Sequence, residues 1–336
     1  MDAVAVAAAI LGDRAVADAP LAPLTTYKVG GRAALLAMVD QPDDIALVGR
    51  AVATSGIPVL VVGKGSNLLV ADAGFPGLAV MLGDGFTDID ELDANRVRAG
   101  AGVSRPVLAR RTAAASLTGF EWAVGVPGSV GGGVRMNAGG HGSDIGRSLQ
   151  VCRIVDLATG SDLEVGVGEL GLGYRRSRVG PAQVVIWAEL QLAPGDRSTS
   201  EQTITEIVRW RRENQPGGQN AGSVFTNPKG YSAGRLVDAA GLRGLRHGSA
   251  QVSEKHANFI QAGLGGSADD VAALIDEVIR RVADHTGVLL HTEVRMIGFA
   301  RSASSLDELE FLPEPSTSFS TSESDGEGQP SSGGSG

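Results

Sequence analysis

The sequence predicts a mixed fold of helices and strands, α/β or α+β, organised as two or three domains. First, a helix signal, a β-branched strand, a glycine turn and a second strand follow one another over residues 42–70. Second, the chain has 336 residues and is 43% apolar, which is enough for domains of about 100–150 residues each. Third, its 48 glycines are clustered, which indicates tight turns or close approaches of backbone to a ligand.

The charge pattern argues against a nucleic-acid partner. The net charge is −9, but seven acidic residues follow Arg301 in a segment without Lys or Arg. The rest of the chain has 29 basic and 31 acidic residues, so it lacks the basic surplus of a nucleic-acid-binding protein. The run Ala3–Leu11 is too short for a membrane span and follows no basic residue. With Cys152 as the only cysteine, no internal disulfide is possible, and we expect a cytoplasmic protein without membrane insertion.

Local patterns place the elements in the first two thirds of the chain. Pro42–Gly56 has the Pro and acidic start and the Gly stop of a helix, and 57–62 is a β-branched strand. We further expect a strand at 68–70 after the glycine turn, a strand at 95–103, a helix at 105–117, and strands at 151–156 and 184–192. Gly119–Gly142 is dense in glycine with little periodicity, which is typical of a functional loop.

A change in composition at Pro194–Ser200 indicates a domain boundary. Beyond it we expect an amphipathic helix at 201–214, with Ile204, Ile207, Val208 and Trp210 on its apolar face, and a polar loop at 215–222. Ser267 and Asp270 form a capping-box pattern that opens a helix over 267–284, Gly287 ends it, and 288–298 is the last strand. From about residue 302 the composition is that of a disordered acidic tail.

Two glycine-rich motifs are candidates for ligand binding. In the first, Gly63, Lys64, Gly65, Ser66 and Asn67 follow a buried strand, where backbone N–H groups can converge on an anion; a plain strand-to-strand turn is the alternative. It matches neither the P-loop nor the dinucleotide fingerprint. The second runs from Gly125 through Gly133, and it suits a ligand lying flat on bare backbone, or else a flexible loop. Gly166–Gly171 matches G-x-G-x-x-G, but no apolar helix follows, so we reject it.

Three polar groups could carry chemistry, each with a simpler structural explanation. Arg175 lies in a cluster of guanidinium groups suited to a carboxylate or phosphate, or in an exposed basic turn. Ser223 could donate a proton at the edge of a cleft, or be an ordinary turn serine. Glu293 faces opposite to the apolar side of the last strand, toward a cleft or toward solvent. The five histidines lack zinc-ligand spacing, and we expect no metal site.

Eight motifs in order over residues 22–298 resemble the UDP-N-acetylenolpyruvoylglucosamine reductase family (MurB). They are TTYKVGG, GKGSNLLV, GFEWAVGVPGSVGGGVRMNAGG, YRRS, AGSVFTNP, AGRLVDAAGLRG, VSEKHANFI and HTEVRMIG. The resemblance implies an α+β fold, with a two-lobed FAD-binding region of the vanillyl-alcohol-oxidase (PCMH) type and a C-terminal α+β substrate domain. The corresponding boundaries are 1–80 and 81–196 for the two lobes, 197–301 for the substrate domain and 302–336 for the tail.

The resemblance also implies the site residues. Catalytic roles go to Arg175, Ser223 and Glu293, and substrate contacts to Tyr174, Asn227 and Lys229. Non-covalent FAD is expected against the two glycine motifs, at Gly63, Lys64, Gly65, Ser66, Asn67, Gly125, Pro127, Gly128, Ser129 and Gly132. Only 47 residues separate Arg175 from Ser223, which resembles the subgroup without the tyrosine-bearing substrate flap. Gly133, Gly140 and His141 depart from the family pattern, in which alanines and an aromatic residue are common.

The implied reaction is the NADPH-dependent reduction of UDP-N-acetylglucosamine-enolpyruvate to UDP-N-acetylmuramate in peptidoglycan synthesis. N5 of FAD would supply a hydride to the methylene carbon, and Ser223 a proton to C2. The expected partner is this small nucleotide sugar, and we expect a monomer. The alternatives are another FAD-dependent oxidase of the vanillyl-alcohol-oxidase type, or a flavin- or nucleotide-sugar-binding module without catalysis.

Overall fold

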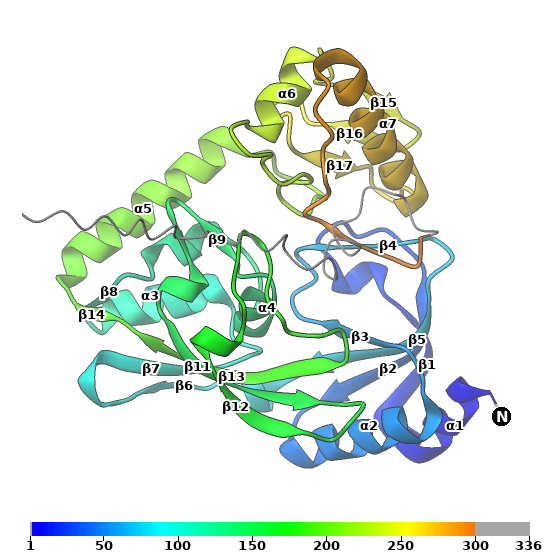
Figure 1. Cartoon of the computed structure of the whole chain (residues 1–336), viewed down its shortest axis with the longest axis vertical. Coiled ribbons are helices and arrows are strands. Elements are labelled where there is room, and N and C mark those ends of the chain that lie inside the picture. The colour runs from blue at the N-terminus through cyan, green and yellow to red at the C-terminus, as the bar shows by residue number, and fades with distance from the viewer. Residues whose placement is uncertain (1, 300–336) are drawn as a thin grey trace, which may run out of the picture.

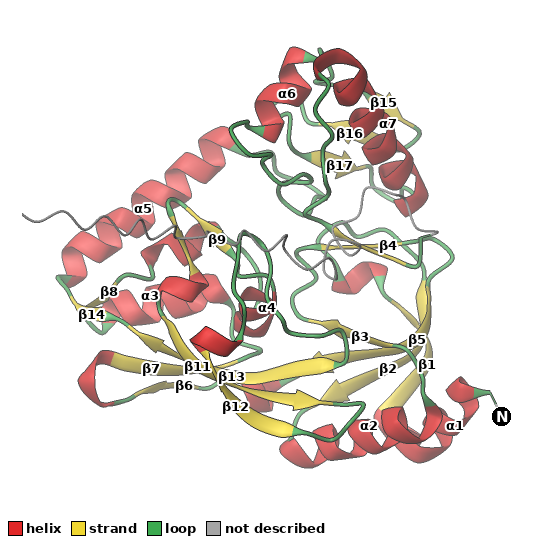
Figure 2. Ribbon diagram, in the orientation of Figure 1, coloured by secondary structure: helices red, strands yellow, loops and turns green. Residues whose placement is uncertain are grey.

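Seven α-helices and several small sheets make up the described part of the chain, which is residues 2–299 of a computed structural model (Figures 1 and 2). The tail predicted from residue 302 lies outside these residues. The helices are α1 (Ala3–Leu11), α2 (Pro42–Ser55), α3 (Arg105–Ala114), α4 (Val130–Arg135), α5 (Arg197–Asn214), α6 (Ala233–Ala239) and α7 (Ala268–Thr286). None of the described helices has the length and apolar character that a membrane span requires.

The strands fall into three spatial groups. The first holds β1 (Ala15–Pro20), β2 (Arg32–Val39), β3 (Val59–Val62), β4 (Leu68–Val70) and β5 (Phe75–Leu82). The second holds β6 (Ile89–Glu91), β7 (Arg96–Gly100), β8 (Leu117–Thr118), β9 (Gly139–Gly140), β10 (Ser143–Asp144), β11 (Leu149–Asp156), β12 (Asp162–Gly166), β13 (Gln183–Gln191) and β14 (Ala193–Pro194). The third holds β15 (Arg246–His247), β16 (Ala250–Val252), β17 (Ile260–Ala262) and β18 (Arg295–Ile297).

The first lobe is a four-stranded sheet of order β1-β2-β5-β3 covered by α1 and α2 (Figure 2). β5 runs parallel to both β2 and β3, and β1 is antiparallel to β2. The amphipathic α2 forms as expected, because Ile45, Val48 and Val52 are buried and Gly56 ends the helix in the left-handed region. The strand expected from residue 57 begins at Val59.

The second lobe is an antiparallel sheet of order β12-β11-β13-β7-β6, with α3, α4 and α5 on one face (Figure 2). Its central strand β13 serves two cores, since Val185 packs within this lobe while Val184 and Ile186 pack against residues of the first lobe. Because they share this core, the two lobes pack directly against each other and are not separate domains joined by a linker.

Two sequence expectations for this lobe were wrong in detail. The helix from Arg105 ends at Ala114, because Leu117 and Thr118 leave it to pair with β14. The glycine-dense segment 119–142 is not irregular throughout, since it contains α4. Gly131–Gly133 weaken a helix, but Ser129 accepts a hydrogen bond from the Gly132 amide as N-cap, and burial of Val130 and Val134 stabilises the turn.

The third unit packs α6 and α7 on the short sheet β15-β16-β17. α7 confirms the capping and periodicity signals: Ser267 accepts a hydrogen bond from the Asp270 amide, the buried residues form one stripe, and Gly287 ends the helix. The last strand is regular over Arg295–Ile297 only, where β18 pairs in parallel with β4 of the first lobe. Upstream of β18, Thr292 makes a single bridge with Phe225 instead.

The α5 helix connects the second lobe to the third unit. Ile204 and Ile207 pack into the core of the second lobe, as the amphipathic pattern predicts. Val208 and Trp210 are instead 41% and 45% exposed, so the expected apolar face is narrower than four residues. The boundaries at residues 80/81 and 196/197 stay predictions; the first falls within β5, and the second precedes a helix that shares the core of the second lobe.

Candidate active site

A cavity of about 860 Å³ lies where the two lobes and the third unit meet. Its walls come from the first glycine turn, the second glycine segment, the C-terminal end of α5 with the loop behind it, and β18. All ten residues expected to hold the cofactor line it, as do Arg175, Ser223 and Glu293. Tyr174, Asn227 and Lys229 are not among the described lining residues.

The first glycine turn links β3 to β4 and requires its central glycine. Gly65 has φ +59°, and a side chain there would run into the backbone of Leu24. The Thr26 amide donates a hydrogen bond of 3.1 Å to the Gly65 carbonyl, which fixes the turn from outside. Gly65 therefore lets the turn pack tightly against residues 24–26 while the turn lines the cavity.

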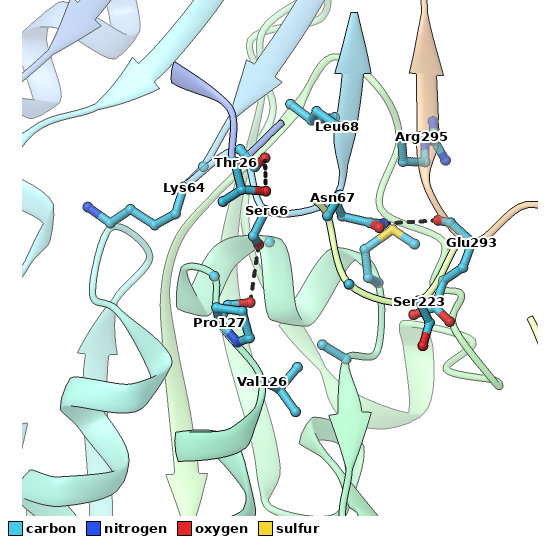
Figure 3. A pocket seen from close by; sticks show the side chains of 18 of the residues that line it. Thr26, Lys64, Ser66, Asn67, Leu68, Val126, Pro127, Ser223, Glu293 and Arg295 are labelled. Carbon is cyan, nitrogen blue, oxygen red and sulfur yellow. Dashed lines mark hydrogen bonds between the residues drawn. The ribbon is translucent and has the colours of Figure 1, made fainter. Parts of the chain in front are cut away.

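Hydrogen bonds join this turn to the other walls of the cavity (Figure 3). Ser66 Oγ donates to the Pro127 carbonyl at 3.1 Å, so the two glycine motifs are in direct contact. Asn67 Nδ2 donates to the Glu293 carbonyl at 3.0 Å, and the Arg295 amide donates to the Asn67 carbonyl at 2.9 Å. The first lobe thus positions the backbone that carries Glu293.

Arg175 and Glu293 form an ion pair inside the cavity. Arg175 Nε lies 2.8 Å from Glu293 Oε1, and both side chains are less than a fifth exposed. Arg175 adopts φ +59°, an uncommon backbone conformation for a non-glycine residue. Burial raises the pKa of Glu293 above its usual value, and the charge and hydrogen bond of Arg175 oppose that effect.

Ser223 lies next to Glu293 (Figure 3). It follows Gly222, whose φ of +81° turns the chain into the cavity. The Glu293 amide donates to the Val224 carbonyl at 2.7 Å, and Asn258 bonds both main-chain groups of Phe225. Serine and carboxyl group are therefore held on two backbone segments that are hydrogen-bonded to each other.

The three predicted substrate contacts lie outside this wall. Tyr174 is 57% exposed, with its ring beneath the Arg175 guanidinium at 5.1 Å. Asn227 Oδ1 accepts a hydrogen bond from the Ala233 amide near the start of α6, and Lys229 follows in the same loop. Their role in substrate binding stays a prediction.

The charged residues in the wall favour anionic ligands. They are Lys64, Arg105, Arg135, Arg175, Arg211, Arg295 and Glu293, six basic residues and one acid. Clustered positive charge at low dielectric raises the local concentration of anions. A dinucleotide with a diphosphate, or a nucleotide sugar, has the charge and the extended shape that this cavity accommodates.

Sequence reasoning missed part of the wall. The sequence predicts a helix that begins at Arg105 but no role for this side chain, which is buried and lines the cavity. Trp210 was assigned to a core face, but its ring meets that of His141 edge-on at 5.2 Å, beside the cavity. Burial and the charge of Arg211 lower the pKa of His141.

The bare-backbone turns and the electropositive wall are features of FAD-dependent oxidoreductases, and comparison with known proteins supports that class. Residues 33–166 match the FAD binding domain family, and residues 214–297 match the family "UDP-N-acetylenolpyruvoylglucosamine reductase, C-terminal domain". The chain belongs to the UDP-N-acetylenolpyruvoylglucosamine reductase family, and its cofactor is FAD. The predicted α+β class with an FAD-binding region is thereby confirmed.

Relatives and a solved structure match nearly the whole described chain. The reductase of Paramagnetospirillum magneticum is 43% identical over 85% of this chain and 93% of its own length. The reductase of Heliobacterium modesticaldum is 44% identical over 83% of this chain and 89% of its own length. The crystal structure of MurB from Thermus caldophilus superposes with a TM-score of 0.72 at 34% identity, over 84% of this chain and 98% of that one.

Proposed function

We propose that this chain reduces the enolpyruvyl ether of UDP-N-acetylglucosamine-enolpyruvate to UDP-N-acetylmuramate with NADPH, as a step of peptidoglycan precursor synthesis. The main support is that Arg175, Ser223 and Glu293, from three distant segments, line one cavity with both glycine turns. When bound there, FAD would supply the hydride that the methylene carbon of the enol ether accepts. The remaining chemistry belongs to side chains of this protein.

Arg175 would stabilise the negative charge that develops when hydride adds to the methylene carbon. That charge spreads into the substrate carboxylate, and a guanidinium can hold a carboxylate through charge-assisted hydrogen bonds. The ion pair with Glu293 orients the guanidinium before substrate arrives. Burial raises the pKa of Glu293, which favours the protonated form that would donate a hydrogen bond to the same carboxylate, while the charge of Arg175 opposes that shift.

Ser223 would complete the reaction by giving its hydroxyl proton to C2. A serine hydroxyl is a weak acid, so it suits a strongly basic carbanion. Its place beside Glu293, on a turn hydrogen-bonded to the strand of that residue, supports the assignment. Glu293 and Arg175 then face the carboxylate while Ser223 faces the carbon that is protonated.

The reductant and the substrate would use the same cavity in turn. The G-x-G-x-x-G sequence at 166–171 spans the end of β12 and a short turn, and none of it lines the cavity. We assign Tyr174, Asn227 and Lys229 to the nucleotide-sugar end of the substrate, because the loops that carry them adjoin Arg175 and Ser223. We further propose that FAD is held non-covalently and that the protein acts as a cytoplasmic monomer.

The test separates the two half-reactions in the purified flavoprotein. Ser223→Ala should leave reduction of the flavin by NADPH unchanged and slow reoxidation by the enolpyruvyl substrate by about 10²–10⁴-fold. Ser198→Ala, an exposed serine on α5, is the matched control and should behave as the wild type. Full-speed reoxidation of Ser223→Ala would remove the proton-donor role, and NADPH oxidation indifferent to the substrate would refute the proposed activity.

A further inference from the structure

Arg105 is a buried cation in the cavity wall with incomplete hydrogen bonding. It is the first residue of α3, and only 5% of its surface is exposed. Nη2 donates to the Pro127 carbonyl at 2.6 Å. Nε and Nη1 are buried without a hydrogen-bond partner among the described residues. Burial of this guanidinium has removed its hydrogen bonds to water, and only one hydrogen bond to the protein replaces them.

No described carboxylate forms an ion pair with this guanidinium. Burial, together with the like charge of Arg175, lowers the pKa of Arg105 to about 10. The side chain therefore remains charged at neutral pH. A buried charge that lacks a counter-charge destabilises the protein that contains it.

The guanidinium lies where the two glycine motifs touch. A methyl group at Gly128 would approach Nη2 to 2.5 Å, and one at Gly133 would approach Cδ to 3.1 Å. The Pro127 carbonyl that accepts from Arg105 also accepts from Ser66 of the first turn. Both glycines therefore make room for the guanidinium, which places positive charge beneath the bare backbone of the cofactor site.

We propose that Arg105 is a cofactor-binding residue whose charge is balanced by the diphosphate of bound FAD. The diphosphate is the part of the cofactor with full negative charge, and a guanidinium fork matches phosphate oxygens. The inference goes beyond the proposed reaction, because it concerns cofactor retention and depends on neither NADPH nor the nucleotide sugar. If the diphosphate balances this charge, the charge of Arg105 should destabilise the flavin-free protein and stabilise the flavin-bound protein.

The experiment compares Arg105→Leu with Arg105→Lys in the full chain, using flavin-free protein titrated with FAD and, separately, with riboflavin, which has no phosphate. Arg105→Leu should weaken FAD binding by about 10- to 100-fold, as expected for a lost charge-assisted contact, and change riboflavin binding by less than about 3-fold. Arg105→Lys keeps the charge and should retain most of the affinity for FAD. Arg110→Leu makes the same change of charge on an exposed part of α3 and should bind both as the wild type.

Thermal unfolding gives a second readout that a purely structural role would not produce. Flavin-free Arg105→Leu should unfold at the same or a higher temperature than the wild type, and FAD should raise that temperature by less. Unchanged FAD affinity, or equal losses for FAD and riboflavin, would overturn the proposal. So would an apoprotein that Arg105→Leu destabilises or prevents from folding, because the side chain would then be needed for the fold itself.

Discussion

The contact between Asp72 and the start of α7 offers a quantitative test of how the third unit is fixed to the first lobe. Asp72 lies just beyond β4, and its carboxylate accepts hydrogen bonds from Ser267 Oγ at 2.5 Å, the Ala268 amide at 3.0 Å and the Asp269 amide at 3.2 Å. Asp72→Ala removes both carboxylate oxygens and with them all three hydrogen bonds. The carboxylate lies at the exposed N-terminus of α7. Losing its hydrogen bonds should lower the free energy of unfolding by about 0.5–2 kcal/mol, and losing its charge near the helix dipole by about 0.3–1 kcal/mol more.

We therefore expect Asp72→Ala to lower the free energy of unfolding of the flavin-bound chain by about 1–3 kcal/mol. Denaturant unfolding followed by circular dichroism measures this, with Asp72→Asn, which keeps one acceptor oxygen, as the milder variant. Ser267→Ala completes a double-mutant cycle, whose coupling energy should exceed about 0.5 kcal/mol because the two side chains are in contact. A loss below about 0.3 kcal/mol, or strict additivity, would mean that the contact does not fix the two units together.

Two further predictions concern titratable groups. Because burial raises the pKa of Glu293, the wild type should lose stability relative to Glu293→Gln as the pH rises above the usual Glu pKa of 4.5. Denaturant unfolding from about pH 4 to pH 8 measures the free energy of unfolding of both proteins, and that of the wild type should fall relative to that of the variant. A difference that does not change with pH would contradict the assigned pKa direction. Cys152 is fully buried in β11, and burial raises the pKa of its thiol to about 12, so we expect no covalent bond between this thiol and the flavin. Acid precipitation of the protein should therefore leave all the flavin in solution. Flavin in the pellet would instead indicate a covalent bond at His141, which lines the cavity.

Elements with strong local signals were predictable from the sequence. α7 has its cap, its apolar stripe and its terminal glycine within twenty-one residues, and each works through neighbours in the chain. The same holds for α2. α4 was missed because three of its six residues are glycine, and what stabilises it is burial of Val130 and Val134 against distant segments. The helix propensities of its residues do not predict α4, because its stability comes from tertiary packing.

The candidate site was predictable where it is made of motifs and unpredictable where it depends on packing. The glycine turns indicate ligand binding by themselves, whereas Arg175, Ser223 and Glu293 were singled out through the resemblance of their motifs to a known family. Nothing local to Arg105 indicates that its guanidinium lies between Gly128 and Gly133. Trp210 follows the helical period of Ile207, yet its ring contacts that of His141 and stays 45% exposed instead of packing into a core.

The parallel pairing of β18 with β4 has a consequence for biosynthesis. The partner of Leu68–Val70 is made more than two hundred residues later, so a nascent chain can fold both lobes while Glu293 is still inside the ribosome. Until that strand emerges, Arg175 lacks its counter-ion and Asn67 has no Glu293 carbonyl to bond. A chain interrupted between residues 134 and 292 would thus contain both glycine turns but lack Glu293 of the proposed catalytic centre, and synthesis has to pass β18 before that centre can be complete.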